Sequence, residues 1–212
     1  MAGAACMTRT NPTLTFETDL WNGGIQYIAG LDEAGRGALA GPVAVGAVIL
    51  PNDKQLLSPL KRVRDSKQLT PLQRESLAPL IKEIALTWSV GFATAAEIDT
   101  QGIVRATRLA ALRALHQFSL TPQYLLTDFR LELPQLDISQ TSLVKGDARC
   151  LSIACASILA KTERDALLRE LDARHSGYGL GKHKGYGTQA HRSAMKRLGL
   201  SPVHRKSFSF KA

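Results

Sequence analysis

Four acidic residues stand where apolar, strand-like runs of the chain end. They are Asp32, Glu33, Asp128 and Asp147. Carboxylates gathered at the strand ends of one sheet would repel one another, and some would stay protonated, unless a divalent cation lay between them. Carboxylate oxygens suit Mg²⁺ or Mn²⁺, which support phosphoryl transfer by a two-metal route. One acid alone would be an ordinary solvated turn residue, but four in this pattern predict metal-binding, catalytic carboxylates.

A glycine-rich turn directly follows the first two acids. Residues 35–40 match the dinucleotide-binding pattern G-x-G-x-x-G/A, but that pattern needs a helix next. Here Pro42 and a Val/Ile-rich run follow instead, and the two acids would repel a pyrophosphate, so we reject the dinucleotide-binding interpretation. The turn, with Gly35 and Gly37, can instead bring backbone amides and Arg36 against a nucleic-acid sugar or phosphate.

Further candidate residues carry less specific signals, and each has a plain structural alternative. Ser66 and Lys67 could hold a phosphate, although surface lysines usually bind nothing specific. Tyr186 lies among glycines and basic residues, where its ring could pack on a sugar or base, or could be half-buried packing. His183 could act as a general acid or base, a role that a lone histidine rarely has.

The net charge of this 212-residue chain is +9, and it is very unevenly distributed. Residues 173–212 contain nine Lys and Arg and no acid, whereas residues 1–172 are neutral overall. A basic segment of this kind favours an anionic partner, most often nucleic acid, although it could also be a basic tail without a specific purpose. With 44% hydrophobic and 21% charged residues, the composition argues against a disordered chain, a collagen-like fibre or a membrane span.

The cysteines and the N-terminus indicate a cytoplasmic protein without a membrane partner. Cys6, Cys150 and Cys155 cannot pair completely and show no Cys-x-x-Cys spacing, which argues against structural zinc and favours reduced thiols. The N-terminus has no apolar run of signal-peptide length, and no stretch approaches 18 apolar residues. We expect residues 1–24 to form a loose leader before the fold begins.

The elements that must position these side chains alternate between strands and helices. The β-rich or alternating runs predict strands over 25–31, 42–50, 87–95, 123–128 and 142–147. Apolar periodicity predicts helices over 71–86, 96–118, 148–173 and about 188–199. Thr70 and Pro71 are typical of a helix start, and Pro79 predicts a kink or break. Loops are expected over 57–70 and 175–191. The order predicts a mixed α/β sheet.

Six short motifs occur in an order that resembles bacterial ribonuclease HII, the type 2 ribonuclease H. They are DEAGRG at 32–37, RDSKQL at 64–69, VKGD at 144–147, SIACASILAKTERD at 152–165, YGLGKHKGYGT at 178–188 and HRKSF at 204–208. The resemblance runs from Ile25 to Phe208 and implies a ribonuclease-H-like α/β fold. This fold would have a mixed five-stranded sheet flanked by helices and a C-terminal helical extension. Residues 25–172 would form the catalytic part and 173–212 the basic extension.

The resemblance also implies an activity and roles for the candidate residues. The chain would be a monomeric endonuclease that cuts the RNA strand of RNA–DNA hybrids. It would also cut 5′ of ribonucleotides embedded in duplex DNA, in DNA replication and repair, leaving a 3′-hydroxyl and a 5′-phosphate. The four acids would hold Mg²⁺ or Mn²⁺, Gly35, Arg36 and Gly37 would sense the ribose 2′-hydroxyl, and Tyr186 would pack on the adjoining sugar. Ser66, Lys67 and Lys184 would contact substrate. In this family Gly usually follows the third acid, whereas here Phe129 and Arg130 follow Asp128.

Two other classes of function can be weighed against this one. A non-catalytic nucleic-acid-binding module would explain the basic C-terminal residues, but it would gain nothing from four acids that repel phosphate. A nucleotide-cofactor oxidoreductase is suggested only by the glycine pattern at 35–40, which lacks its helix. A metal-dependent ribonuclease needs both the acids and the cations, so it is the function that we expect.

Overall fold

A mixed five-stranded sheet runs through the centre of the computed structural model, which describes residues 11–129 and 131–209. Its strands are β1 (Ile28–Ala34), β2 (Val43–Ile49), β3 (Thr87–Ala93), β4 (Tyr124–Asp128) and β5 (Ser139–Leu143). The strand order is β3-β2-β1-β4-β5; β1 pairs antiparallel with β2, and β2 with β3, while β1, β4 and β5 run parallel. The mixed sheet expected from the sequence is confirmed.

The parallel pairing of β1 with β4 sets the place of the first acids. Leu31 lies opposite Thr127 in the ladder, so the next residues, Asp32 and Asp128, lie side by side toward the carboxyl ends of the two strands. β1 is nearly all buried, and so is β4 between its two parallel neighbours. Buried strands with acids only at their carboxyl ends are the arrangement that the sequence pattern predicts.

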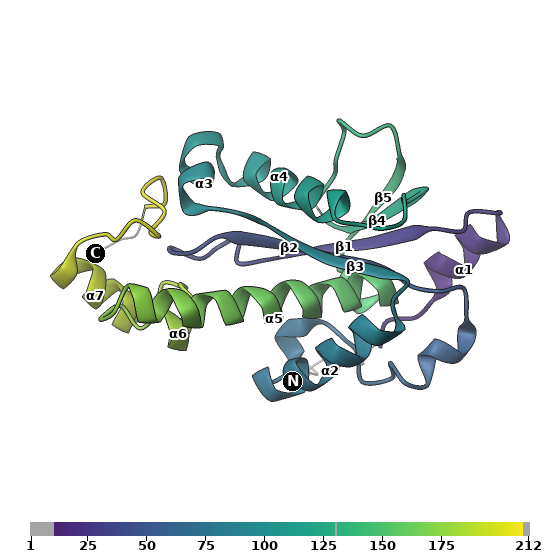
Figure 1. Cartoon of the computed structure of the whole chain (residues 1–212), viewed down its shortest axis with the longest axis horizontal. Coiled ribbons are helices and arrows are strands. Elements are labelled where there is room, and N and C mark those ends of the chain that lie inside the picture. Colours follow the sequence, from purple (N-terminus) through teal and green to yellow (C-terminus); the bar gives the residue numbers. More distant parts are fainter. Residues whose placement is uncertain (1–10, 130, 210–212) are drawn as a thin grey trace, which may run out of the picture.

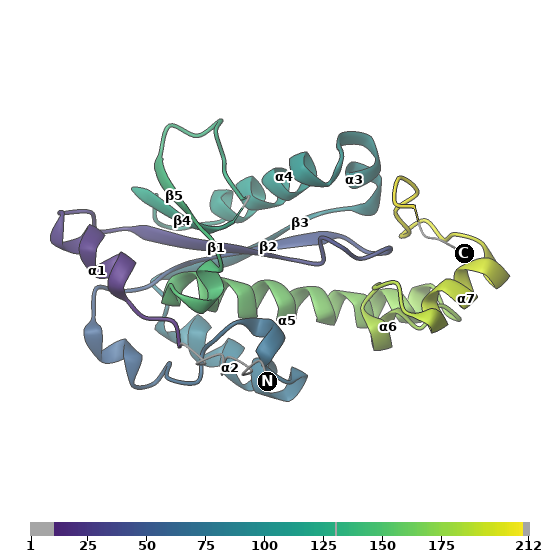
Figure 2. The same cartoon turned by 180° about the vertical axis from the view of Figure 1, so that it is seen from behind.

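Helices cover both faces of the sheet (Figures 1 and 2). α3 (Ala95–Gln101) and α4 (Ile103–His116) lie on one face, and α2 (Pro71–Ile84) and α5 (Leu151–Arg174) on the other. α5 crosses β1 and β2 at very short range because both strands have glycine there. A Cβ on Gly46 would lie 2.2 Å from the carbonyl oxygen of Ala156, so any side chain at that position would push α5 off the sheet.

The start of α2 follows the sequence expectation closely. The hydroxyl of Thr70 accepts a hydrogen bond from the backbone N–H of Gln73, and the Gln73 side chain accepts one from the Thr70 N–H. This capping box, with Pro71 as the first helical residue, satisfies amides that the helix itself leaves unpaired. The helix runs to Ile84 through Pro79 rather than breaking there. Short 3₁₀ turns precede it at Lys54–Leu57 and Ser66–Gln68, within the expected loop region.

Three expectations about the elements were wrong in detail. The single helix expected over 96–118 is two helices, α3 and α4, because Gly102 between them has a φ of 77° that a helix cannot contain. The last strand lies earlier than 142–147, at Ser139–Leu143, and a 3₁₀ turn, Gly146–Ala148, follows it. The expected 175–191 loop contains a short helix, α6 (Leu180–His183).

The described part of the expected N-terminal leader is ordered. Residues 15–22 form a helix, α1 (Thr15–Asn22), in which Glu17 and Trp21 are buried, and Leu14 just before it joins the main core. The Thr/Ala-rich composition suggested a loose segment, but the apolar side chains here pack against the body of the protein. Residues 1–10 lie outside the described residues.

The C-terminal segment packs against the far end of α5. There α6 and α7 (Gln189–Leu198) form a small third core with Leu39 and Ala40 from the glycine-rich turn. Figure 1 shows these elements, in yellow-green, beside the same end of the sheet as α3. Among the described residues, no helix combines the length and the apolar character needed to span a bilayer.

Candidate active site

Three of the four predicted acids lie together at the carboxyl edge of β1 and β4. One side-chain oxygen each from Asp32, Glu33 and Asp128 falls within 4.8 Å of the others. Asp147 comes from the 3₁₀ turn beyond β5, and its Oδ2 lies 3.9 Å from Nζ of Lys67. After burial and Asp65, the nearby charge of Asp128 also raises the pKa of Asp147. The fourth acid is thus close enough to Asp128 to belong to the same site. The structure therefore brings the acids together from three separate parts of the chain.

Three carboxyl groups of this site, those of Asp32, Glu33 and Asp147, have raised pKa values. Burial raises the pKa of Asp32 well above its usual value, and repulsion from Glu33 adds to the effect. Burial also raises the pKa of Glu33, against the opposing attraction of Arg36. The pKa of Asp147 rises to about 6, through burial and then repulsion from Asp65 and Asp128. Without a positive charge among them, these carboxylates are electrostatically frustrated.

Two carboxylate oxygens of the cluster lack a hydrogen-bond partner in the described part of the chain. Oδ2 of Asp32 and Oε2 of Glu33 are buried and have no hydrogen-bond partner among the described residues. Their other contacts are defined: Asp32 Oδ1 accepts from the Glu33 N–H at 2.7 Å, and Glu33 Oε1 lies 3.6 Å from Nη1 of Arg36. These two buried, unpartnered oxygens of β1, together with the Asp128 carboxylate from β4, are a donor set that fits Mg²⁺ or Mn²⁺.

A backbone amide orients the carboxylate of Asp128. Its Oδ1 accepts a hydrogen bond of 2.7 Å from the N–H of Gly146, one residue before Asp147. A Cβ on Gly146 would lie 3.2 Å from that same oxygen and 2.8 Å from the Ile153 side chain. The position of Asp128, which is followed by Phe129 in place of the Gly usual in the family, is thus tied to the turn that carries Asp147.

Two buried arginines hold the glycine-rich turn from within. Arg164 of α5 donates to the carbonyl oxygens of Pro42, Ala40 and Lys184, at 2.8, 3.2 and 3.0 Å. Arg205 donates to those of Gly41, Arg36 and Gly35, at 3.0, 2.8 and 2.8 Å. Six carbonyl groups thus point inward at guanidinium groups.

Gly35 is required by this packing, and Gly37 is not. Gly35 has a φ of 85°, and a Cβ there would lie 1.9 Å from Nε of Arg164. A Cβ on Gly37 would meet no atom of the described chain within 4 Å, and its φ lies outside the left-handed region. Gly37 is exposed, so the space beside it is open to solvent.

Tyr186 lies close to the turn and is 37% exposed. Its ring centroid is 5.4 Å from Nζ of Lys161 and 5.6 Å from the Arg164 guanidinium. Its carbonyl oxygen is 3.0 Å from Nδ1 of His191. The ring therefore presents one accessible face from a loop that is anchored by its backbone.

The neighbouring candidates His183 and Lys184 are engaged within the loop. His183 places Nε2 2.8 Å from the carbonyl oxygen of Tyr178, accepts from the Gly185 N–H at Nδ1, and stacks on His191 with ring centroids 4.2 Å apart. Nζ of Lys184 donates to the carbonyl oxygen of Gly181. A catalytic His183 thus finds no support in these contacts.

Ser66 and Lys67 face in different directions. The Ser66 hydroxyl is buried and accepts from Oγ of Ser157 at 2.8 Å, so its side chain is engaged within the protein. The Lys67 side chain is 76% exposed and lies near the acids. Although burial opposes the shift, attraction from Asp32 and Asp147 raises the pKa of Lys67. Lys67 is the cation at the edge of the carboxylate cluster.

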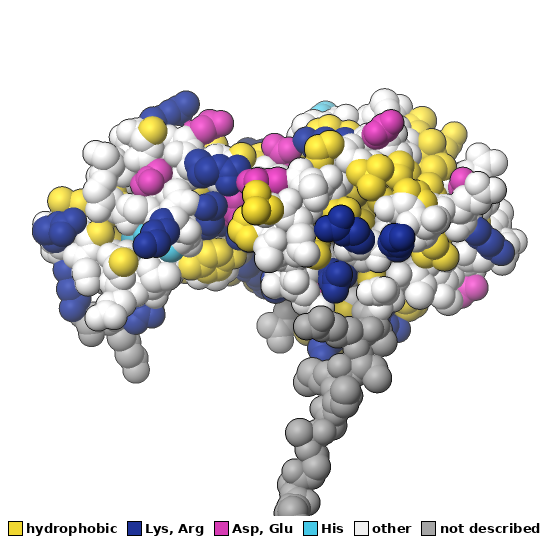
Figure 3. All heavy atoms as spheres, turned by 90° about the horizontal axis from the view of Figure 1, so that it is seen from below, with side chains coloured by type: hydrophobic (Ala, Val, Ile, Leu, Met, Phe, Trp, Pro, Cys, Tyr) yellow, Lys and Arg dark blue, Asp and Glu magenta, His cyan; other side chains and the backbone are white. Residues whose placement is uncertain are grey.

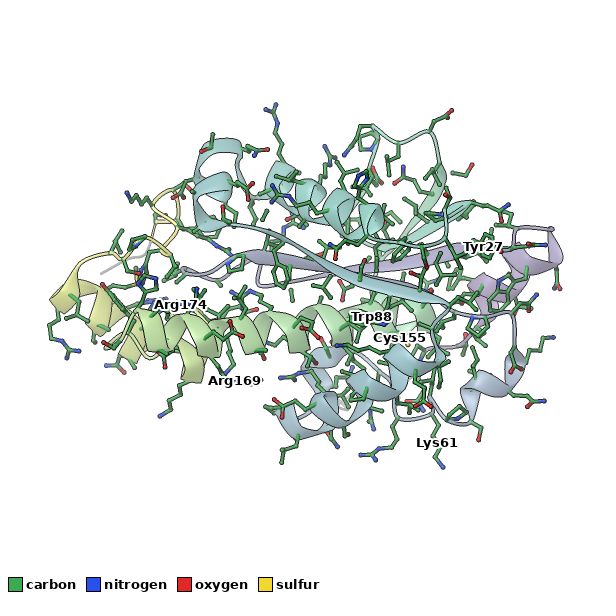
Figure 4. All side chains as sticks on the ribbon, in the orientation of Figure 1. Tyr27, Lys61, Trp88, Cys155, Arg169 and Arg174 are labelled. Atoms are coloured by element: carbon green, nitrogen blue, oxygen red, sulfur yellow. The ribbon has the colours of Figure 1, made fainter. Side chains whose placement is uncertain are left out.

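A cleft separates α2 from α6, and α5 forms its floor. Five basic side chains line it, from Arg74, Lys161, Arg169, Lys182 and Lys184. The acids Glu75 and Asp165 line it as well: Asp165 pairs with Arg74 and Lys161, and Glu75 with Arg169. Figure 3 shows a narrowed waist between the two halves of the molecule, where Lys, Arg and acidic side chains gather. Arg169 and Arg174 lie on the second half of α5, where Figure 4 labels them on opposite sides of the helix.

The family model for ribonuclease HII matches residues 29–211. This chain belongs to the ribonuclease HII family. It is 49% identical to the ribonuclease HII of Dehalococcoides mccartyi over 91% of this chain and 90% of that protein. It is also 49% identical to that of Thermus thermophilus, over 91% of each chain. The ribonuclease HII of Archaeoglobus fulgidus, solved in a complex with PCNA, is 26% identical and superposes with a TM-score of 0.73, covering 88% of this chain and 96% of that one.

Membership gives the activity class directly. The chain is a ribonuclease H, a metal-dependent endonuclease of RNA–DNA substrates, and its sheet has the ribonuclease-H-like fold of its relatives. The binding-module and oxidoreductase alternatives are not favoured, since the match spans the acids, the glycine-rich turn and the C-terminal segment together.

Ribonuclease HII motifs in this chain also contain residues that sequence reasoning left without a role. Arg164 and Arg205 lie in the motifs at 152–165 and 204–208, yet only the structure shows that they hold the glycine-rich turn. Asp65 stands beside Asp147 and was missed as well. One signal could have found Arg164: it continues the buried face of an apolar helix, where an unpaired arginine is costly.

Proposed function

We propose that Asp32, Glu33, Asp128 and Asp147 hold Mg²⁺ or Mn²⁺ and hydrolyse the phosphodiester bond on the 5′ side of a ribonucleotide. Cleavage would leave a 3′-hydroxyl and a 5′-phosphate. The observation that carries this proposal is the convergence of the three acids from β1 and β4, with buried, unpartnered oxygens on Asp32 and Glu33. A divalent cation bound between the acids would complete the bonding of these oxygens.

The bound metal would activate the attacking water and stabilise the leaving oxygen. The protein's own part is to hold the carboxylates in place. The Gly146 N–H fixes Asp128, and the Glu33 N–H fixes Asp32. Lys67, which retains its proton, offers a positive charge at the open side of the cluster, where a substrate phosphate would approach.

The choice of a ribonucleotide is assigned to the glycine-rich turn and to Tyr186. Because Arg205 holds the carbonyl groups of Gly35 and Arg36 inward, the amides of residues 35–37 would be presented to the substrate. Gly37 has no internal requirement for glycine, which supports a close approach by substrate at that point. A ribose 2′-hydroxyl is both donor and acceptor and is the group that distinguishes RNA from DNA. The Tyr186 ring would pack on the adjoining sugar.

The two segments of the chain would then divide the work. Residues 25–172 would cut, and residues 173–212 would extend the basic cleft that grips an RNA–DNA hybrid or a duplex with embedded ribonucleotides. Lys184 would contribute by its charge, and Ser66 by shaping the loop of Lys67 rather than by its buried hydroxyl. The protein would act as a monomer in the cytoplasm, in the removal of ribonucleotides from DNA, where its thiols Cys150 and Cys155 stay reduced.

The Asp32→Asn variant tests this assignment. It removes one charge from the cluster while keeping the size of the side chain, so cleavage should fall by about 10²-fold or more, the usual range for a group that acts on the transition state. Binding of an RNA–DNA hybrid should persist or strengthen, because a charge that repels phosphate is lost. Wild-type turnover in Asp32→Asn would overturn the proposal. Glu83→Gln, an exposed acid on α2, is the matched control.

A further inference from the structure

The carboxylate of Glu17 reaches from α1 to the first turn of α5. Its Oε1 accepts from the Ser152 N–H at 2.8 Å and from the Cys150 thiol at 3.1 Å, across 135 and 133 residues of chain. Glu17 is 1% exposed. Figure 2 shows α1 and the start of α5 at the same end of the molecule. The buried carboxylate of Glu17 thus links α1 to the backbone of α5.

The first turn of α5 depends on this contact because it has no cap of its own. Cys150 occupies the N-cap position, and its side chain makes no capping hydrogen bond with the described residues. Burial and the nearby Glu17 raise the pKa of the Cys150 thiol, so it keeps its proton and donates it to Oε1. An anionic oxygen at the positive end of a 24-residue helix also gains from the helix dipole.

A second contact runs beside the first. The Thr13 N–H donates to the Arg149 carbonyl at 3.1 Å, and the Leu151 N–H donates to the Thr13 carbonyl at 3.0 Å. Thr13 and Cys150 therefore form an isolated parallel bridge. Together, Thr13 and Glu17 engage every residue from Arg149 to Ser152, and we call these contacts the N-terminal clamp.

The clamped residues continue directly into the carboxylate site. The Cys150 N–H donates back to the Gly146 carbonyl at 2.8 Å, and the Arg149 N–H to the same oxygen at 3.0 Å. The N–H of Gly146 in turn holds Oδ1 of Asp128, and Asp147 is the next residue. Only three peptide units separate Asp147 from the Cys150 thiol that Glu17 binds.

We propose that Glu17 is a positioning residue for this nuclease: by clamping the start of α5, it sets the turn that carries Asp147 and the amide that orients Asp128. The inference rests on the proposed role of those two acids as metal ligands. It also gives a reason for burying the carboxylate of Glu17, which costs free energy in folding. A serine at position 150 would cap α5 locally, without a buried carboxylate. What the distant Glu17 adds is a tie between α1 and the turn of the active site.

The test compares Glu17→Ala and Glu17→Gln with two controls. Gln keeps an accepting oxygen, whereas Ala removes it. Ile81→Val trims the core between α2 and α5, so it lowers the melting temperature without touching the clamp. Glu83→Gln removes an exposed acid from α2. All five proteins are studied as full chains, well below their melting temperatures.

The first readout needs no activity. Hydrogen exchange of the metal-free proteins should show the amides of residues 146–152 exchanging about tenfold faster in Glu17→Ala than in the wild type, because the clamp no longer limits local opening. Calorimetry with Mn²⁺ should show affinity weakened by about tenfold, the lower end of what the loss of a ligand-orienting contact costs. Glu17→Gln should fall between, and both controls should match the wild type.

Steady-state cleavage of a duplex with one ribonucleotide supplies the second readout. Glu17→Ala should lower kcat by about tenfold and raise the metal concentration needed for half-activity, while KM for the duplex stays unchanged. If Glu17→Ala loses only melting temperature, as Ile81→Val does, and keeps wild-type exchange, Mn²⁺ affinity and kcat, the inference is overturned. Full activity of Asp32→Asn would instead overturn the proposed function, so the two failures are distinct.

Discussion

Arg205 donates a hydrogen bond of 2.8 Å to the carbonyl oxygen of Gly35, a residue 170 positions earlier in the chain. The same guanidinium group binds the carbonyl groups of Arg36 and Gly41. Burial lowers the pKa of Arg205 to about 9, so it remains charged at neutral pH. The C-terminal segment is thus built into the glycine-rich turn, and one of its nine cations serves the inside of the protein rather than the nucleic acid.

Replacing Arg205 by Lys should loosen the turn while keeping the charge. An ammonium group cannot reach three carbonyl groups in the fork geometry of a guanidinium. At least one buried carbonyl is left unpaired, so the free energy of unfolding should fall by about 1–3 kcal/mol in urea denaturation. Cleavage of a single-ribonucleotide duplex should lose about tenfold in kcat/KM, which corresponds to about 1.4 kcal/mol.

Lys206→Ala is the matched control for Arg205→Lys, because its side chain is exposed and adjacent. It should change unfolding by less than about 0.5 kcal/mol. A fully active, fully stable Arg205→Lys protein would contradict the role given to these hydrogen bonds.

The two glycines of the turn should respond in opposite ways to alanine. Gly37→Ala should leave stability within about 0.5 kcal/mol, because the added methyl group meets only open space in the free protein. It should nevertheless reduce cleavage by at least about tenfold, since that space is where the substrate would approach. Gly35→Ala should destabilise the fold itself, through its φ of 85° and the clash with Arg164. Thermal unfolding and cleavage, measured side by side, separate the two; an active Gly37→Ala would sink the assignment.

A pair of buried histidines should make the fold acid-sensitive. Nε2 of His191 lies 3.1 Å from Nε2 of His204, and only one of these two atoms can carry a hydrogen in that contact. Burial lowers the pKa of His191 from 6.5 to about 4, and it lowers that of His204 as well. The unfolded chain therefore binds protons at a higher pH than the folded one does. Their contribution is fully present above about pH 6.5 and is lost as the pH falls toward 4.

Urea midpoints measured between pH 7 and pH 4.5 check this expectation. The wild type should lose at most about 3 kcal/mol from His191 over that range. His191→Gln should flatten the pH dependence, while His116→Gln, at an exposed position on α4, should not. An equal slope in the wild type and His191→Gln would contradict the assignment.

Salt dependence should reveal which cations touch the nucleic acid. Lys182 and Arg169 line the cleft between α2 and α6. If each neutralises one phosphate of a duplex, its replacement by Ala should reduce the slope of log K against log salt by about 0.9. Lys61, labelled in Figure 4, is exposed near the opposite end of the molecule from α6, and Lys61→Ala should leave the slope unchanged. Unchanged slopes in the two cleft variants would place the duplex elsewhere.

The sequence predicted the strands of the sheet and the meeting of Asp32 with Asp128, for one physical reason. Both acids end buried apolar runs, and parallel neighbours expose their carboxyl ends at one edge. Asp147 was placed at a strand end as well, but the structure has it in a 3₁₀ turn beyond β5. The apolar run SLV continued the pattern past the point where Leu143 leaves the sheet, so periodicity alone put the boundary too late.

Contacts between distant segments could not be read from the sequence. Glu17 stands in a Thr/Ala-rich stretch that gave no helix signal, and its partner Ser152 is 135 residues away. Arg164 and Arg205 are recognisable as basic residues, but nothing in their spacing tells that they point at backbone carbonyl groups instead of at solvent. The net charge likewise overstated how many cations of the C-terminal segment can contact nucleic acid, because Arg205 binds carbonyl groups inside the protein. Side-chain direction, and not residue type, decided each of these cases.

The most direct test of the central claim is a cleavage assay on a DNA duplex that carries one ribonucleotide, with an all-DNA duplex of the same sequence as control. The wild-type protein should cut once, on the 5′ side of the ribonucleotide, leaving a 3′-hydroxyl and a 5′-phosphate. The cut should require Mg²⁺ or Mn²⁺, should stop with a chelator, and should be absent from the all-DNA duplex. Cutting of both duplexes, or cutting that continues in the chelator, would contradict the account.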